Sequence, residues 1–383
     1  MTVTTPRGFL ASGVPAGLKS TGAKDLALVV NQGPNHDSAT VFTANRCKAN
    51  PVLWSQEVVK DGVVRAVVLN SGGANCYTGA DGFQTTHAVA EQVAGHLGIG
   101  AIDVVVCSTG LIGLANSRQD LLAGVDAAHA ALSADGGSDA AEAIMTTDSV
   151  SKNVVIEGAG WKIGGMAKGA GMLAPQLATM LVVLTTDAIV EAGDLDTALR
   201  AATRVSFDRL DSDGCMSTND TVTVMASGAS GITPTLADFT EALTQACTDL
   251  AMQLLKDAEG ADHEIAITVL NAASEDEAVE VGRSIARSNL FKAAVFGKDP
   301  NWGRVLASIG TTSAAFDPAD LDVAMNGVWV CRNSTPAEDP AGVDLSGREV
   351  SVTVDLKAGS ERACVWTNDL THAYVHENSA YSS

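Results

Sequence analysis

The sequence has few basic residues and no long apolar segment. Its 383 residues include 24 Lys and Arg against 45 Asp and Glu, which gives a formal net charge of -21. A nucleic acid or an anionic membrane surface would need clustered basic residues, so this composition argues against both as partners. No apolar run approaches the roughly 20 residues of a membrane-spanning helix, and residues 1–8 lack the features of a signal peptide. We therefore expect a cytoplasmic protein that acts on small molecules.

The cysteines and histidines form no recognisable framework. The seven cysteines are odd in number, and no two of them are spaced as Cys-x-x-Cys. This distribution argues against a set of disulfides and against a zinc site, and it favours reduced thiols. His372 and His376 lie four residues apart, but no further ligands accompany them, so we expect no metal.

Nucleotide-binding glycine motifs are also missing. Lys168 precedes Gly169 and Gly171, whereas the lysine of a P-loop follows its glycines, and no Gly-x-Gly-x-x-Gly lies between a strand and a helix. Short β-rich runs alternate with helical patterns, which predicts an α/β fold. Strands are expected at 26–30, 64–69, 104–106, 182–184 and 265–269, and helices at 86–96, 239–256 and 275–287. The Ala-rich segment 127–143 predicts a helix, a loop and a second helix.

The most informative segment is 168–181, a glycine-rich, proline-interrupted loop that enters an apolar run through the Ala178-Thr179 bond. If that bond breaks, Thr179 becomes a new N-terminus. Its hydroxyl is then a nucleophile, and its own α-amine can serve as the base. The competing interpretation is an ordinary strand start in which Thr179 is only a β-branched residue.

Other segments carry groups suited to acyl transfer through a hydroxyl. Residues 104–110 predict a strand that ends in a small polar turn, where the Thr109 hydroxyl and the Gly110 amide could hold an oxyanion; a common strand-end turn is the alternative. In residues 144–148, Ile-Met-Thr-Thr-Asp, three polar residues follow an apolar pair. This pattern is also typical of a helix cap or a turn.

Two further segments carry acidic or polar residues, one at the end of a predicted helix and one at the end of the sequence, where a binding role is unusual. Residues 257–260, Asp-Ala-Glu-Gly, place Glu259 at the end of a predicted helix, where acidic groups are electrostatically unfavourable. Residues 377–383 are polar and would ordinarily be a frayed tail.

In combination, these segments resemble the ornithine acetyltransferases, the glutamate N-acetyltransferases of arginine biosynthesis that form the ArgJ family. The resemblance extends from about residue 6 to residue 383, and it departs from the family at 261–263, where Ala-Asp-His replaces the usual Thr followed by Lys or Arg. The matching motifs are STG at 108–110, MTTD at 145–148, KGAGMLAPQLATML at 168–181, STNDT at 217–221, DAEG at 257–260, PNWGR at 300–304 and ENSAYSS at 377–383.

The resemblance implies the α/β sandwich of ArgJ and DmpA proteins, cut by its own chemistry into an α chain, 1–178, and a β chain, 179–383. It implies that Thr179 is the nucleophile and that Thr109 and Gly110 hold the oxyanion. The substrate-binding residues that it implies are Thr146, Lys168, Thr179, Glu259, Asn378 and Ser383. For Lys168 the alternative is an ordinary exposed lysine. STNDT and PNWGR receive no firm role, although a packed Trp302 and a structural Arg304 are expected.

The implied reaction is a ping-pong transfer of acetyl from N2-acetyl-L-ornithine to L-glutamate through an acetyl ester of Thr179, without a cofactor. Acetyl-CoA as a second donor is left open. Family members assemble as heterotetramers of two α and two β chains, and the same is expected here. Two other functions are weighed against this one: a self-processing amidohydrolase or aminopeptidase of related fold, and an uncleaved amino-acid-binding protein without enzymatic activity.

Overall fold

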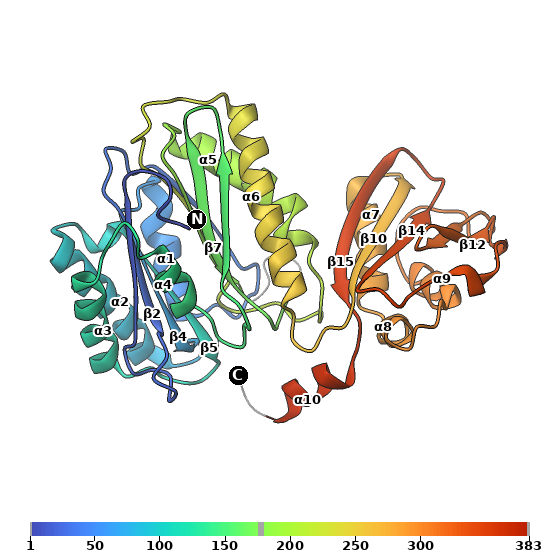
Figure 1. Ribbon diagram of the computed structural model, residues 1–383, viewed down its shortest axis with the longest axis horizontal. Helices are drawn as coiled ribbons and strands as arrows, with labels where there is room; N and C mark the ends of the chain where they lie inside the picture. Colours follow the sequence, from blue (N-terminus) through green and yellow to red (C-terminus); the bar gives the residue numbers. More distant parts are fainter. Residues whose placement is uncertain (1, 175–179, 381–383) are drawn as a thin grey trace.

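The computed structural model describes residues 2–174 and 180–380, which form two bodies (Figure 1). The larger body contains two sheets that pack face to face, with helices on both outer sides. The smaller body contains a third sheet with its own helices. A last helix, α10 (His372–Ala380), leaves the smaller body and lies below the junction of the two.

The first sheet of the larger body has the strand order β1-β2-β4-β5, with β4 and β5 parallel and the other pairs antiparallel. Its strands are β1 (Phe9–Val14), β2 (Leu26–Asn31), β4 (Ala66–Gly73) and β5 (Val104–Leu111). Every residue of β2 is buried, because this central strand is covered on both faces.

The second sheet has the order β3-β9-β8-β7-β6, with β8 and β9 parallel and the other pairs antiparallel. Its strands are β3 (Ser38–Phe42), β6 (Lys152–Glu157), β7 (Lys162–Lys168), β8 (Leu181–Thr186) and β9 (Thr221–Ala226). Between the two sheets, Val67 and Val105 of the first pack in one cluster with Val183 of the second. The sheets therefore share one apolar layer.

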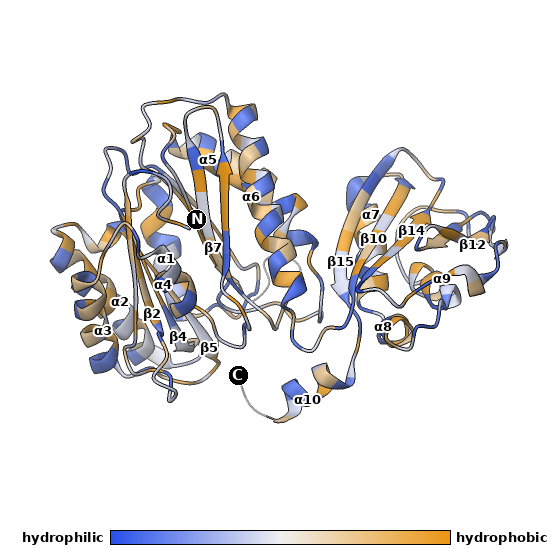
Figure 2. Cartoon of the chain, in the orientation of Figure 1, coloured by the Kyte–Doolittle hydropathy of each residue, from blue (hydrophilic) through white to orange (hydrophobic). Residues whose placement is uncertain are grey.

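Helices cover the outer faces of this pair of sheets. In Figure 2, α6 carries hydrophobic and hydrophilic residues together, as expected for a helix with one buried side. The first sheet is covered by α2 (Gly79–Leu97) and α3 (Arg118–Ala130), and the second by α5 (Ala192–Val205) and α6 (Leu236–Lys256). Two shorter helices, α1 (Asn50–Val58) and α4 (Gly137–Ala143), pack against β5 and β1.

The smaller body has the strand order β13-β12-β11-β14-β10-β15, in which β10 and β14 run parallel. Its strands are β10 (Glu264–Ala272), β11 (Asp322–Met325), β12 (Val328–Arg332), β13 (Thr335–Pro336), β14 (Glu349–Asp355) and β15 (Glu361–Asn368). The helices α7 (Glu275–Ala286), α8 (Asn289–Phe296) and α9 (Trp302–Ile309) pack on its apolar face. Burial alternates along β10 and β14, so one face of this sheet is covered and the other is partly exposed.

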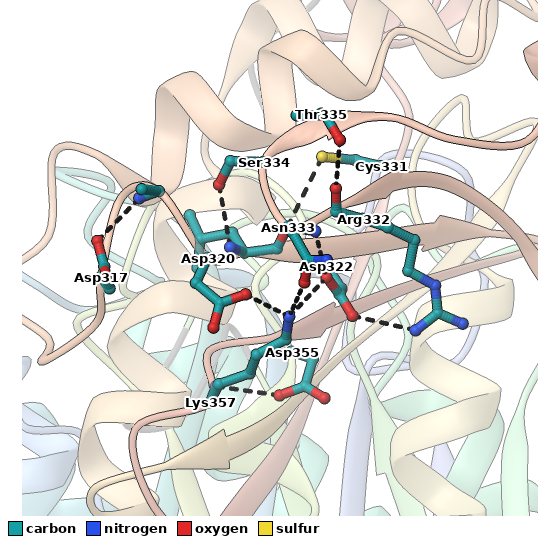
Figure 3. Close-up of polar contacts among 12 residues, drawn as sticks. Asp317, Asp320, Asp322, Cys331, Arg332, Asn333, Ser334, Thr335, Asp355 and Lys357 are labelled. Carbon is teal, nitrogen blue, oxygen red and sulfur yellow. Dashed lines mark hydrogen bonds and ion pairs between the residues drawn. The ribbon is translucent and has the colours of Figure 1, made fainter.

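A lysine beyond the end of β14 ties together three segments of the smaller body (Figure 3). The Lys357 Nζ atom lies 2.6 Å from Asp320 Oδ1, 2.9 Å from Asp322 Oδ1 and 2.7 Å from Asn333 Oδ1. The hydrogen bonds with Asp320 and Asp322 raise the pKa of Lys357. The ammonium group thus neutralises two carboxylates that would otherwise repel each other.

The predicted strands and helices are confirmed, and most of them extend further than the sequence patterns indicate. The helix expected at 86–96 begins at Gly79, because glycines at its start hide the helical pattern. Gly82 is buried there, and a Cβ atom at this position would lie 1.9 Å from Thr78 Oγ1. The Ala-rich segment forms the end of α3, a connection and α4, as predicted.

The predicted division at residues 178 and 179 does not coincide with a boundary between the two bodies. β7 lies before this point and β8 after it, yet the two strands pair antiparallel from Ile163 with Thr186 to Lys168 with Leu181. The proposed α and β chains would therefore share one sheet and one core. Cleavage itself stays a prediction, since Ala178 and Thr179 lie outside the described residues.

Candidate active site

The proposed oxyanion turn lies at the end of β5, beside the parallel strand β4. Gly110 has a φ of +126°, and a Cβ atom at this position would lie 2.6 Å from the carbonyl carbon of Gly72. Only glycine fits this approach of two backbones. Thr109 is buried, and its Oγ1 atom accepts a hydrogen bond of 3.0 Å from Lys168 Nζ. Because the lysine is the donor, the Thr109 hydroxyl keeps its own proton for another acceptor.

Lys168 is the last residue of β7, and only 1% of its surface is exposed. The interpretation of this residue as an ordinary exposed lysine is therefore wrong. Burial lowers the pKa of Lys168, while Asp148, Asp220 and Glu259 act in the opposite direction. A buried lysine that interacts electrostatically with three carboxyl groups is typical of a functional site.

Asp148 connects the MTTD segment with the glycine-rich loop. Its Oδ1 atom accepts hydrogen bonds from Lys152 Nζ at 2.7 Å and from the Gly169 amide at 2.6 Å, and its Oδ2 atom accepts from the Thr146 amide at 3.0 Å. Burial alone would raise the pKa of Asp148, but Lys168 and Lys152 outweigh burial, and the pKa is lowered. Asp148 is thus an ionised carboxylate that fixes both loops.

Glu259 lies between the same two loops. Its backbone amide donates to the Ala170 carbonyl at 3.0 Å, and its Oε1 atom accepts a hydrogen bond of 2.7 Å from Thr147 Oγ1. A Cβ atom on Gly171 would lie 2.7 Å from Glu259 Oε1, so a larger residue there would displace the carboxylate from this position. The side chain of Thr147 contacts Glu259, whereas Thr146 is held through its backbone.

The STNDT segment fixes the strands that lead into the site. Asn219 Nδ2 donates to the Ser108 carbonyl at 2.8 Å and to the Ala74 carbonyl at 2.6 Å, so it joins the ends of β5 and β4. Asp220 is fully buried, and its Oδ1 atom accepts a hydrogen bond of 2.9 Å from the Met180 amide. Burial raises the pKa of Asp220 well above its usual value. This carboxyl group holds the residue that follows Thr179.

The start of α10 packs directly on the segment that carries Glu259. Gly260 has a φ of +61°, and a Cβ atom there would lie 2.2 Å from the Tyr374 amide nitrogen. Burial raises the pKa of Tyr374 to about 12, with Asp213, Glu259 and Cys215 adding to the effect. Asn378 is exposed, and its amide donates to the Tyr374 carbonyl at 3.0 Å within the helix. Its contact with a substrate stays a prediction, and Ser383 lies outside the described residues.

The Ala-Asp-His segment that departs from the family pattern has a structural explanation. His263 is buried, and its Nδ1 atom lies 2.7 Å from Asp369 Oδ2. The other oxygen of Asp369 accepts from the backbone amides of Asp262 and His263 at 3.1 and 2.9 Å. These contacts join the chain where it enters the smaller body to the chain where it leaves, and they leave Glu259 in place.

Three other residues considered in the sequence, Cys107, Trp302 and Arg304, have structural rather than catalytic positions. Burial raises the pKa of the Cys107 thiol to about 12, which makes it a poor nucleophile. Trp302 packs against the apolar cluster of the smaller body, and Arg304 Nη1 donates to the Leu290 carbonyl, as expected for a structural pair.

In the described ranges, no group of three or more His, Cys, Asp or Glu is arranged to hold a metal ion. No described helix is long and apolar enough to cross a membrane.

The structure therefore brings Thr109, Gly110, Lys168 and Glu259 together with the loop at 144–149. Sequence reasoning gave no role to Asp148, Asp220 or Asn219, although all three stand inside the quoted motifs. Their only signal was an acid or amide next to small polar residues, which is equally typical of turns.

Comparison with known proteins decides the family. The model of the ArgJ family matches residues 10–383. The chain belongs to the ArgJ family. It is 62% identical to the arginine biosynthesis bifunctional protein ArgJ of Streptomyces coelicolor and 61% identical to that of Thermobifida fusca, over 100% of both chains in each comparison. It is also similar to a crystal structure of ornithine acetyltransferase complexed with ornithine from Mycobacterium tuberculosis, with 53% identity over 47% of this chain and 96% of that one and a TM-score of 0.45.

Membership of the ArgJ family confirms three predictions. The protein is an acyltransferase of arginine biosynthesis, and its function is glutamate N-acetyl transfer. Its fold is the predicted α/β sandwich, whose layers the two sheets and their covering helices form.

Proposed function

We propose that this chain transfers acetyl from N2-acetyl-L-ornithine to L-glutamate through an acetyl ester on Thr179, after cleavage of the Ala178-Thr179 bond. The observation that carries the proposal is the contact between Lys168 and Thr109, because it joins the glycine-rich loop that leads to the cleavage site with the oxyanion turn. Met180 and Leu181, the first described residues after Thr179, lie beside Asp220 and Lys168.

In the proposed first half-reaction, Thr179 Oγ attacks the carbonyl carbon of the acetyl amide, and the Thr179 α-amine takes up the hydroxyl proton. The Thr109 hydroxyl and the Gly110 amide donate to the oxyanion. The C–N bond then breaks, the proton passes to the leaving amine, and ornithine departs. In the second half-reaction the glutamate amine attacks the ester, and N-acetylglutamate leaves with Thr179 regenerated.

Charge complementarity supports the proposed binding roles. The Glu259 carboxylate is half-buried and suits a substrate ammonium group, and Thr147 holds that carboxylate in place. Lys168 is buried, so we propose that it acts on the substrate through its charge and by orienting Thr109. Thr146, Asn378 and Ser383 complete the proposed set, with Thr146 on the loop that Asp148 fixes.

The remaining proposals concern partners and location. We propose acetyl-CoA as a second donor, supported by the word bifunctional in the names of the relatives. We also propose that the cleaved α and β chains form a heterotetramer. The cytoplasm is the proposed location, supported by seven cysteines that are all free thiols.

The test is isotope exchange. Purified protein is mixed with N2-acetylornithine and labelled ornithine, without glutamate, and label in acetylornithine is measured over time. A covalent acetyl intermediate predicts that label enters acetylornithine without glutamate. Thr179→Ala should lose this exchange, whereas the control Thr233→Ala, at an exposed residue, should retain it. Transfer to glutamate without such exchange would contradict the ester mechanism, and release of free acetate instead of transfer would favour a hydrolase.

A further inference from the structure

Four arginines gather at the junction of the two bodies, in a chain whose net charge is -21. They line a cavity of about 620 Å³ between the end of α5, the following turn and α7. Arg204 and Arg209 come from the larger body, whereas Arg283 lies in α7 of the smaller one and Arg287 directly follows that helix. None of the described residues proposed for acetyl transfer lines this cavity.

Two guanidinium nitrogens in this cavity have no hydrogen-bond partner in the part of the chain that the structure describes. Arg209 is only 5% exposed; it donates to the Arg204 carbonyl at 2.9 Å and to Glu275 at 2.5 Å, but its buried Nη1 atom has no hydrogen-bond partner within the described ranges. Arg283 donates to the Asp208 carbonyl at 3.0 Å, and its buried Nε atom likewise has no partner there. Buried donors are normally satisfied, so these two indicate an acceptor that binds between them.

Three acidic residues, Asp208, Asp276 and Glu280, also line the cavity, and Asp208 acts on Arg283 through its charge. Two of them and the neighbouring Asp211 make the following contacts. Asp276 pairs with Arg204 at 3.0 Å, and Asp211 pairs with Arg287 at 2.8 Å. Both oxygens of Glu280 accept from the Ser313 hydroxyl at 2.9 Å. These acids therefore already have cationic or hydroxyl partners.

Electrostatics favour an added negative charge. Burial lowers the pKa of Arg283, and the neighbouring charges of Arg287 and Arg209 lower it further, while Asp211 and Asp208 oppose the shift. Like charges held together in a partly buried place repel each other, and an anion between them would remove part of that cost.

We propose that this cavity is a second ligand site that binds the oxyanion group of a small molecule, a carboxylate or a phosphate, between Arg209 and Arg283 and beside Arg287, which lines the same cavity. Planar guanidinium groups match both groups through paired hydrogen bonds. Because the arginines come from both bodies, the bound anion would connect the larger body to α7. The site goes beyond acetyl transfer, because the described residues proposed for that reaction do not line this cavity.

The test is titration calorimetry on the full chain with two probes, inorganic phosphate and succinate, at constant ionic strength set with chloride. We expect saturable binding of one probe molecule per chain. Arg287→Gln and Arg283→Gln should each weaken it by about 10-fold to 100-fold, the value of a lost charged hydrogen bond. The control Arg332→Gln removes an arginine of the smaller body that pairs with Asp322 and should leave affinity unchanged.

The two probes distinguish the ligand chemistry, since tighter phosphate binding assigns a phosphate ligand and tighter succinate binding a carboxylate. Arg287 is half-exposed, so Arg287→Gln is expected to fold even if Arg283→Gln does not. Heat signals no stronger than those of chloride, or binding that Arg287→Gln leaves unchanged, would overturn the proposal.

Discussion

Asp148→Asn is the substitution that most severely tests the electrostatic account of the site. Asp148 is buried against two lysines, and one of them, Lys152, has no exposed side-chain surface. Asparagine keeps an oxygen that can accept from the Gly169 amide, but it removes one of the two carboxylates that pair with Lys152, the other being Asp257 at 2.6 Å. It also removes the neighbouring charge that acts most strongly on Lys168. Removing one partner of a buried ion pair costs about 3 to 5 kcal/mol.

That cost predicts a large change in thermal stability. In a body of this size, each kcal/mol lost from the free energy of unfolding lowers the melting temperature by about 2 to 4 °C. The expected decrease in melting temperature is therefore about 6 to 20 °C. Scanning calorimetry would compare both proteins in a Thr179→Ala background, in which the proposed cleavage is prevented. The control is Asp126→Asn, whose partner His96 is on the surface at 2.6 Å and whose ion pair is worth at most about 1 kcal/mol.

The pH dependence of the same pair supplies a second readout. The pKa of Asp148 is lowered in the folded protein, so its contribution to stability is complete above the unfolded value of about 3.9 and is lost as the pH falls through the folded pKa. The difference in melting temperature between the parent and Asp148→Asn should therefore shrink in acid below about pH 4. A difference of under 2 °C at pH 7, or one that grows in acid, would refute the reasoning.

Four further predictions follow from particular contacts. Gly110→Ala places a Cβ atom 2.6 Å from the Gly72 backbone, so it should reduce kcat for acetyl transfer by about 10²-fold to 10³-fold, measured after circular dichroism shows an intact fold. Glu259→Gln should leave cleavage unchanged and raise KM for the amino-acid substrates about 10-fold to 100-fold; unchanged KM would remove this residue from the site. Asp220→Asn keeps an acceptor for the Met180 amide and removes a carboxyl group whose raised pKa makes stability fall as pH rises above about 4, so its melting temperature at pH 7 should equal or exceed that of the parent. Lys357→Ala removes the ion pair of Asp320 and leaves Asp322 with Arg332, so it should lower the urea midpoint of the smaller body, with no such change in Lys60→Ala.

The sequence predicted the α/β class and the positions of the main elements, because buried strands such as Val182–Leu184 and amphipathic helices such as 239–256 have strong local patterns. Their arrangement into two bodies was not predictable, since nothing local indicates that strands before and after residue 178 share a sheet. The motifs located the site, but they did so through resemblance, and periodicity alone would have favoured a strand start at Thr179.

The contacts within the site depended on the folded chain. Sequence reasoning treated exposure as the usual state of a lysine, whereas Lys168 is buried at the end of β7, which lies between two other strands of its sheet. Asp148 joins segments about 20 residues apart, and Asn219 joins segments more than 100 apart, so neither role has a local signal.

The most direct test of the account is the intact mass of the purified protein under denaturing conditions, measured after mixing with N2-acetylornithine. The account predicts two polypeptides that meet between Ala178 and Thr179, with one added acetyl group on the polypeptide that begins at Thr179. A single uncut chain that still transfers acetyl to glutamate, or an acetyl group on any other residue, would contradict it.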